Sequence, residues 1–277
     1  MPLLNRPRTL ALATCAMALC LCGFAAAGPI NTDVALTPRK GGAIFRLQYR
    51  YTDADGAGMI QHVNSSNVIG TLVYGITERL AVFLTVPYAN RQVDRVVPRM
   101  GRVEQAHDGL ADITFKLKYR FWQKDLGPGD TIRWAALAGL NIRSGDGDFS
   151  SDSYDPIIGT VFSVRLGRKL FDTDLVYQMN TGRGEFRHDT LRYDVSAAYR
   201  LVVGETRNTT YELDTVIELN GRYVADGTHE LYLSPGLQFI TEQWALEASI
   251  QLPVVQDLSS GQPEPSVRLV AGLRLSW

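Results

Sequence analysis

The chain has 277 residues, of which 45% are hydrophobic and 21% charged, and its formal net charge at pH 7 is −1. This balance excludes the basic surface that nucleic-acid-binding proteins carry, so we expect no nucleic-acid partner. The mean hydropathy of −0.07 does not by itself indicate a membrane protein.

The first 27 residues have the pattern of a secretory signal peptide. Arg6 and Arg8 precede an uncharged apolar run over residues 10–24, and residues 25–27 are three alanines. We therefore expect cleavage before Gly28, although residues 10–27 are 18 uncharged residues, which is also long enough for a transmembrane anchor. All three cysteines lie in this segment, so a processed chain has no disulfide bond.

Residues 28–40 follow as an expected periplasmic N-terminal segment, and the barrel is expected over residues 41–277. From residue 41 onward apolar and polar residues alternate with a period of two, which indicates β-strands. The clearest run, residues 110–122, sets Phe115, Leu117 and Tyr119 against Lys116 and Lys118. Twelve such segments lie near residues 41–52, 64–76, 80–91, 110–122, 131–143, 156–166, 170–180, 190–201, 209–223, 229–240, 243–255 and 265–277.

The connections between these segments differ in length on the two sides. Links after even-numbered strands are mostly short, at 77–79, 167–169 and 241–242, with somewhat longer ones at 123–130 and 202–208. Links after odd-numbered strands are mostly longer and polar, at 92–109, 144–155, 181–189 and 256–264. This asymmetry predicts an all-β fold: a transmembrane antiparallel up-and-down β-barrel of about 12 strands with periplasmic termini.

A soluble barrel or sandwich shows the same alternation with the apolar face inside. Aromatic residues favour the membrane alternative, because they gather at both ends of the predicted strands as interfacial girdles do. The group near the short-turn ends comprises Tyr74, Phe121, Trp122, Trp134, Phe171, Tyr199, Tyr211, Phe239, Trp244 and Trp277. The group near the long-loop ends comprises Tyr51, Tyr88, Tyr177, Tyr193 and Tyr223.

The polar faces predict charged walls in the lumen. The basic wall consists of Lys116, Lys118, Arg120, Arg133 and Arg143. The acidic wall consists of Asp172, Asp174, Glu212, Asp214, Glu218 and Glu247. Two interpretations stay open: facing walls that set a transverse field in a channel, and charges that pair and fill a narrow barrel.

Some positions on the predicted lumen face are apolar. They are Ile69, Val73, Phe83, Leu137, Ile157, Val161 and Val216. Such residues either line a path for a small apolar solute or pack against one another inside the barrel.

The long-loop ends carry the histidines and an acidic loop, and neither has the spacing of a known metal site. The histidines are His62, His107, His188 and His229, and the aspartates are Asp146, Asp148, Asp152 and Asp155. We expect no metal or other cofactor, and a loop that is solvated or bridged to lipopolysaccharide by divalent ions. With histidines in loops and no GxSxG motif, we also expect no enzymatic activity.

The last residues, 267–277, alternate up to a terminal tryptophan. Leu273, Leu275 and Trp277 resemble the C-terminal signal of bacterial outer-membrane proteins, which implies recognition by the barrel-assembly machinery. We expect this strand to pair with the first and close the barrel, with Trp277 in the periplasmic girdle.

Several stretches resemble the outer-membrane proteins named after the meta-pathway of phenol degradation. They are INTDVALTPRKGG, YGITERLAVFLTVPY, GLADITFKLKYRF, SYDPIIGTVFS, ELNGRY, LYLSPGLQF and ALEASIQLPVVQDLSSGQP. The resemblance implies a bacterial outer-membrane channel or transporter for small apolar or aromatic solutes, in contact with lipid and lipopolysaccharide. A non-conducting barrel that acts as a scaffold or docking partner is the alternative.

Overall fold

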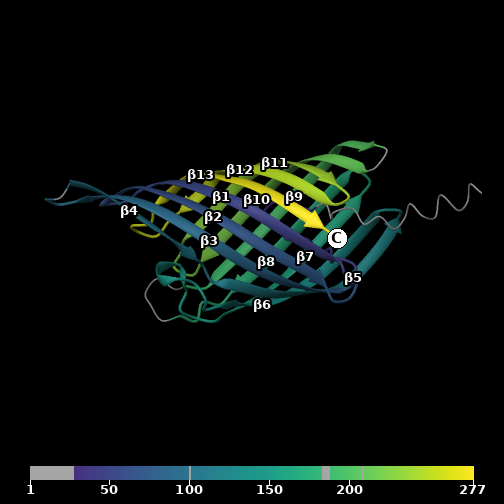
Figure 1. Ribbon diagram of the computed structural model, residues 1–277, viewed down its shortest axis with the longest axis horizontal. Helices are drawn as coiled ribbons and strands as arrows, with labels where there is room; N and C mark the ends of the chain where they lie inside the picture. The colour runs from purple at the N-terminus through teal and green to yellow at the C-terminus, as the bar shows by residue number, and fades with distance from the viewer. Residues whose placement is uncertain (1–27, 100, 183–187, 207–208) are drawn as a thin grey trace, which may run out of the picture.

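The computed structural model describes residues 28–99, 101–182, 188–206 and 209–277, so the expected signal peptide lies outside the described residues. The described chain forms a tilted-strand barrel with a long hairpin extending from one end (Figure 1). Its elements are β1 (Ala43–Asp55), β2 (Ile60–Gly75), β3 (Leu80–Val97), β4 (Gly101–Leu110), β5 (Ile113–Gly127), β6 (Asp130–Ile142), η1 (Gly147–Phe149), β7 (Asp155–Leu166), β8 (Lys169–Gln178), β9 (Thr190–Glu205), β10 (Thr210–Val224), β11 (His229–Thr241), β12 (Trp244–Asp257) and β13 (Glu264–Ser276).

The predicted twelve-stranded antiparallel barrel is confirmed. Consecutive strands pair with each other except β4 and β5, which both pair with β3; β1 pairs with β13, and the ring closes through β2 and β3. Strands β4 and β5 together occupy one position in the ring, next to β3. Strand β4 pairs with residues 88–97 of β3, and β5 pairs with residues 80–85. The thirteen strand segments of the described chain therefore make a twelve-membered ring.

Strand β5 shows how alternation sets the two faces. Phe115, Leu117 and Tyr119 point outward and are 38–49% exposed, whereas Lys118 on the other face is 2% exposed. The pairing of β5 with β6 shifts register after Arg120. This bulge lets the consecutive Phe121 and Trp122 both face outward near the strand end.

Three connections predicted as loops are largely strand. Most of residues 92–109 forms the β3–β4 hairpin, whereas β5 and β9 extend into 123–130 and 202–208. The hairpin lacks an apolar face because both of its sides are in water, so its alternation carries no hydrophobic signal.

The strand structure is interrupted between β4 and β5 at Asp112. This residue holds the loop that follows β6. Its carboxylate accepts hydrogen bonds from the main-chain N–H groups of Ser144 at 3.0 Å, Gly145 at 2.8 Å and Ser151 at 2.6 Å. Burial raises the pKa of Asp112, but the hydrogen bonds from Ser151, Ser144 and Gly145 outweigh burial and hold the pKa below its usual value.

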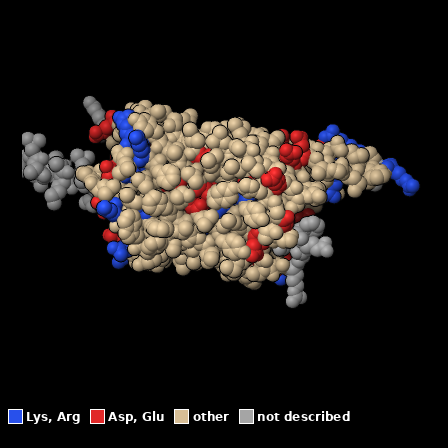
Figure 2. All heavy atoms as spheres, turned by 180° about the vertical axis from the view of Figure 1, so that it is seen from behind, with Lys and Arg blue, Asp and Glu red and all other residues tan. Residues whose placement is uncertain are grey.

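The C-terminal strand closes the barrel as predicted. Residues 44–55 of β1 pair along 264–276 of β13, and the main chains of Ala43 and Trp277 exchange two hydrogen bonds of 3.0 Å. Trp277 is 61% exposed, as are, to a lesser extent, other aromatic residues near strand ends such as Trp244 and Phe121. Charged side chains gather toward the ends of the barrel, and its middle surface is mostly uncharged (Figure 2). No helix in the described residues is long and apolar enough to span a bilayer.

Candidate functional site

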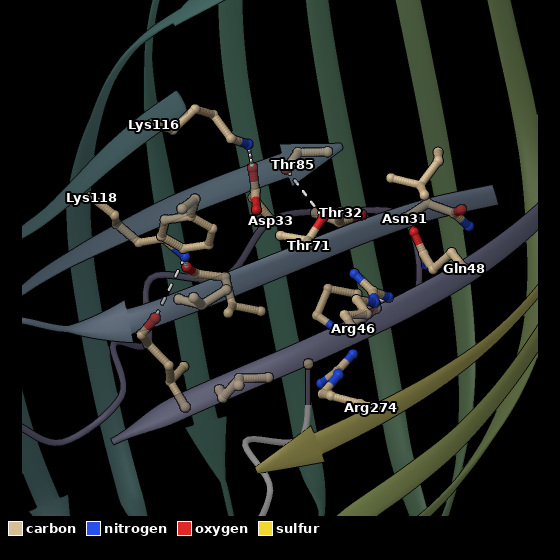
Figure 3. Close-up of a pocket in the computed structure, with 18 of the residues that line it drawn as sticks. Asn31, Thr32, Asp33, Arg46, Gln48, Thr71, Thr85, Lys116, Lys118 and Arg274 are labelled. Carbon is tan, nitrogen blue, oxygen red and sulfur yellow. Dashed lines mark hydrogen bonds and ion pairs between the residues drawn. The ribbon is translucent and has the colours of Figure 1, made fainter. Parts of the chain in front are cut away.

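Residues 28–36 lie inside the barrel, which corrects their expected periplasmic position, whereas Thr37 contacts the carbonyl oxygen of Glu78 in the β2–β3 turn at the barrel end. Main-chain and side-chain atoms of residues 28–36 bond to lumen side chains of six different strands (Figure 3). The segment has no regular secondary structure, so its N–H and C=O groups need other partners. The charged and polar lumen side chains provide them.

Glu218 on β10 holds the start of this segment. Its carboxylate accepts hydrogen bonds from the main-chain N–H groups of Asn31 and Thr32 at 3.0 Å, from Asn31 Nδ2 at 2.7 Å and from Thr32 Oγ1 at 2.9 Å. The residue is 0% exposed. Amide and hydroxyl donors thus stabilise this buried carboxylate, which has no ion pair with any residue that the structure describes.

The next residues connect the two predicted walls. Asp33 forms an ion pair with Lys116 at 3.2 Å and donates its main-chain N–H to the Asp174 carboxylate at 2.6 Å. Lys118 donates to the main-chain carbonyl oxygen of Val34 and, at 3.5 Å, to that of Leu36. The segment therefore lies between the basic residues of β5 and the acidic residues of β8.

Ile30 packs where β11 has a glycine. A Cβ atom at Gly236 would lie 2.5 Å from Ile30 Cδ1, which is closer than any real contact, so glycine makes room for this 0% exposed side chain. The Ile30 carbonyl oxygen accepts hydrogen bonds from Arg46 at 2.6 Å and from Gln48 at 3.0 Å. Apolar packing and polar contacts thus fix the same residue.

All members of the predicted acidic wall are buried, at 0–4% exposure. Asp174 and Glu218 bind the N-terminal segment, and three other members form ion pairs with arginines. These pairs are Asp172 with Arg165 at 3.0 Å, Glu212 with Arg200 at 3.1 Å, and Glu247 with Arg46 at 2.7 Å and Arg274 at 3.0 Å. Both carboxylate oxygens of Asp214 are buried without a hydrogen-bond partner among the described residues.

The basic wall is divided along the barrel. Lys116 and Lys118 contact the N-terminal segment, whereas Arg120 donates to the carbonyl oxygen of Glu78 at 2.6 Å near a turn. Arg133 donates to Thr131 at 3.2 Å. Arg143 does not belong to the lumen wall: it lies beyond the end of β6 and pairs with Asp152 of the following loop at 3.0 Å. The prediction placed it on the lumen face because it assumed that the strand continued to residue 143.

The predicted apolar lumen residues fall into two sets. Leu137, Ile157 and Val161 form a buried cluster with Ala35 of the N-terminal segment, which matches the interpretation as inward packing. Val73 and Phe83 belong to another cluster and, with Ile69, line an internal cavity. Val216 is 1% exposed.

This cavity lies between the N-terminal segment and the barrel wall and has a volume of about 290 Å³. One side is apolar, with Ile44, Ile69, Val73 and Phe83. The remaining wall carries six basic side chains and one acidic side chain: Arg46, Arg50, Lys116, Lys118, Arg192, Arg274 and Asp33. Figure 3 shows the labelled Arg46, Arg274 and Lys118 around this space.

Sequence reasoning missed four of the basic residues, namely Arg46, Arg50, Arg192 and Arg274. The alternation of β1, β9 and β13 contains the signal that was needed, because each arginine stands on the polar face of its strand. The proximity of the three strands to residues 116–118 across the lumen does not follow from alternation.

The histidines and loop aspartates do not form a metal site in the part of the chain that the structure describes, where no group of three or more potential ligands is present. His62 contacts Asp53 at 2.9 Å, His107 contacts Asp148 at 2.8 Å and His229 contacts Tyr193 at 2.6 Å. His188 lies next to Asp189, before β9.

A closed antiparallel barrel with an apolar outer surface and a charged lumen defines an outer-membrane β-barrel of the channel or porin type. The chain belongs to the family described as "Putative MetA-pathway of phenol degradation", whose model matches residues 50–257. No curated protein matches the sequence significantly.

Several solved structures match the chain at low sequence identity, and the likeness in fold rests on the first of them. An outer membrane channel from Pseudomonas putida F1 is 13% identical, with a TM-score of 0.61 over 91% of this chain and 100% of that chain. The beta domain of the Bordetella autotransporter BrkA is 11% identical, with a TM-score of 0.49 over 86% and 100%. The porin NanC is 12% identical, with a TM-score of 0.44 over 84% and 98%.

Proposed function

We propose that this protein is an outer-membrane channel or transporter for small apolar or aromatic solutes. The observation that carries the proposal is the internal cavity, whose apolar side is formed by Ile69, Val73 and Phe83. A site of about 290 Å³ accommodates one substituted aromatic ring, since a cavity of about 150 Å³ already holds benzene. Membership of the phenol-degradation family supports this class of solute.

The proposal includes the route by which the barrel reaches its membrane. Residues 1–27 direct export and are removed, and Leu273, Leu275 and Trp277 are recognised by the barrel-assembly machinery. Lipid surrounds the apolar outer surface, and lipopolysaccharide contacts the extracellular loops. The proposal involves no nucleic acid, cofactor or catalytic step.

A non-conducting scaffold is the second candidate, and one observation favours it. The N-terminal segment occupies the lumen and buries Ile30 and Ala35 completely. If this segment never moves and leaves no path, the barrel serves as a docking platform.

Two measurements on the full chain separate the candidates. Planar-bilayer recordings of the purified barrel test for an aqueous path. Uptake of the apolar fluorophore N-phenyl-1-naphthylamine into cells with intact lipopolysaccharide tests passage of an aromatic solute. Faster uptake than in cells with an equal amount of an unrelated outer-membrane barrel supports the channel. A folded barrel with neither conductance nor uptake contradicts it and favours the scaffold.

A further inference from the structure

The internal cavity combines an apolar wall with an excess of positive charge. Of the basic side chains that line it, Arg46 and Arg274 share the carboxylate of Glu247, and Lys116 pairs with Asp33. These contacts neutralise part of the lining charge. The remaining basic residues determine which solutes the cavity can accept.

Arg50 is the basic residue least satisfied by the protein. Within the described chain it donates one hydrogen bond, to the carboxamide oxygen of Gln48 at 3.2 Å, and its buried Nε has no hydrogen-bond partner there. Among the described residues no carboxylate lies within 4.0 Å of Arg50 or of Lys118, whose ammonium contacts main-chain carbonyl oxygens. Arg192 has only a long contact to Asp194, at 3.7 Å.

Positive charge that is partly withdrawn from water, as at the half-buried Arg50, is unfavourable unless an anion pairs with it. An arginine fork with unused donors matches a carboxylate, which can accept two parallel hydrogen bonds. The apolar wall of Ile69, Val73 and Phe83 in the same cavity requires an uncharged body on the same ligand. A small inorganic anion would leave this wall in contact with water.

We propose that the cavity binds a monocyclic aromatic carboxylate, with its carboxylate at Arg50 and its ring against the Ile69 end of the apolar wall, because Ile69 lies two residues along the β1–β2 ladder from the Arg50–Asn67 pair. This inference rests on the proposed function and narrows its solute class from apolar molecules to aromatic anions. Neutral aromatic molecules of the same size fill the apolar side but leave Arg50 unpaired.

The test measures binding to the purified full-length barrel in detergent by isothermal titration calorimetry. The probes are benzoate, its neutral analogue benzamide, and acetate, which has the carboxylate without the ring. We expect benzoate to bind at least about tenfold more tightly than either analogue, the factor typical of one charge-assisted hydrogen bond. Equal binding of benzoate and benzamide overturns the role of the charge, and equal binding of benzoate and acetate overturns the role of the apolar wall.

Variants locate the site. Arg50→Gln should weaken benzoate binding at least about tenfold and leave benzamide binding within about twofold, because one charged partner is lost. Arg50→Lys should restore part of the affinity for benzoate. The control is Arg222→Gln, which removes a lumen arginine that pairs with Glu230 at 3.1 Å and does not line the cavity. Equal loss in Arg50→Gln and Arg222→Gln overturns the assignment to Arg50.

The outcome also separates this inference from the proposed function. If cells take up N-phenyl-1-naphthylamine through the barrel but benzoate is not preferred, the channel stands and the anion site is wrong. If benzoate binds as expected but no solute passes, the site stands and the channel is wrong.

Discussion

The contacts of Glu218 predict that one isosteric substitution releases the N-terminal segment. Glu218→Gln replaces one carboxylate oxygen by an amide nitrogen, which donates and cannot accept, opposite the N–H groups of Asn31 and Thr32. Hydrogen bonds to charged groups contribute about 1.5–3 kcal/mol each, so we take the loss as about 3 kcal/mol because the bonds are not additive. This loss corresponds to roughly a 100-fold increase in the released fraction.

The assay uses the absence of cysteine after residue 22. A single cysteine at Ala35→Cys replaces a side chain that is 0% exposed. Its maleimide labelling rate in the purified barrel follows the released fraction of the segment. We expect labelling roughly 100-fold faster with Glu218→Gln than without it.

The matched control is Glu230→Gln. Glu230 is also a buried lumen carboxylate, but its partners are Arg222, Arg268 and Tyr232 on the barrel wall. Labelling of Ala35→Cys should not change in this background. An unchanged rate with Glu218→Gln, in a barrel that migrates as folded on an unheated gel, would refute the holding role of Glu218.

Three further outcomes are expected. Epitope tags inserted at 144–155 or 256–264 should be reached by antibody on intact cells, and tags at 167–169 should not; labelling at both sides would contradict the topology. Trp277→Asp should lower the yield of heat-modifiable folded barrel while export continues, and a normal yield would exclude an assembly role. The pKa of Asp112 is lower in the folded protein than in the unfolded chain, so the ionised carboxylate stabilises the loop at any pH above the unfolded pKa. This stabilisation is lost as the pH falls through the folded pKa. Protease should therefore cut 144–155 faster in Asp112→Asn at pH 7, whereas the unmodified loop should stay protected down to about pH 4; equal cutting would show that Asp112 does not hold the loop.

Alternation predicted the barrel well because each strand separates lipid from a polar lumen. On β5 it placed Lys116 and Lys118 inside and Leu117 outside, as the structure has them. It also placed Glu218 and Glu247 inside. A period of two reports which face a residue occupies, and these assignments need nothing more.

The position of the N-terminal segment was beyond that reasoning. Its contacts to Glu218, Asp174 and Lys118 run mainly through main-chain atoms, which almost any sequence possesses. The specific signal is the pairing of Ile30 with Gly236, two residues that are far apart in sequence. Only the three-dimensional ring brings them together. The same holds for the cavity, which is lined jointly by the segment and by side chains of the barrel wall.

The β3–β4 hairpin leaves the closed ring with one free strand edge. In the described chain β4 pairs with no strand other than β3, so most of its other side presents unpaired N–H and C=O groups beyond the end of the barrel; at Leu110 both main-chain groups bond to Asp146. Such an edge invites a strand from a neighbouring molecule. Exposed charges on the hairpin, including Arg102 and Glu104, oppose that association, because a second copy would bring these charges into a new sheet. The hairpin can thus extend beyond the membrane without joining barrels into fibres.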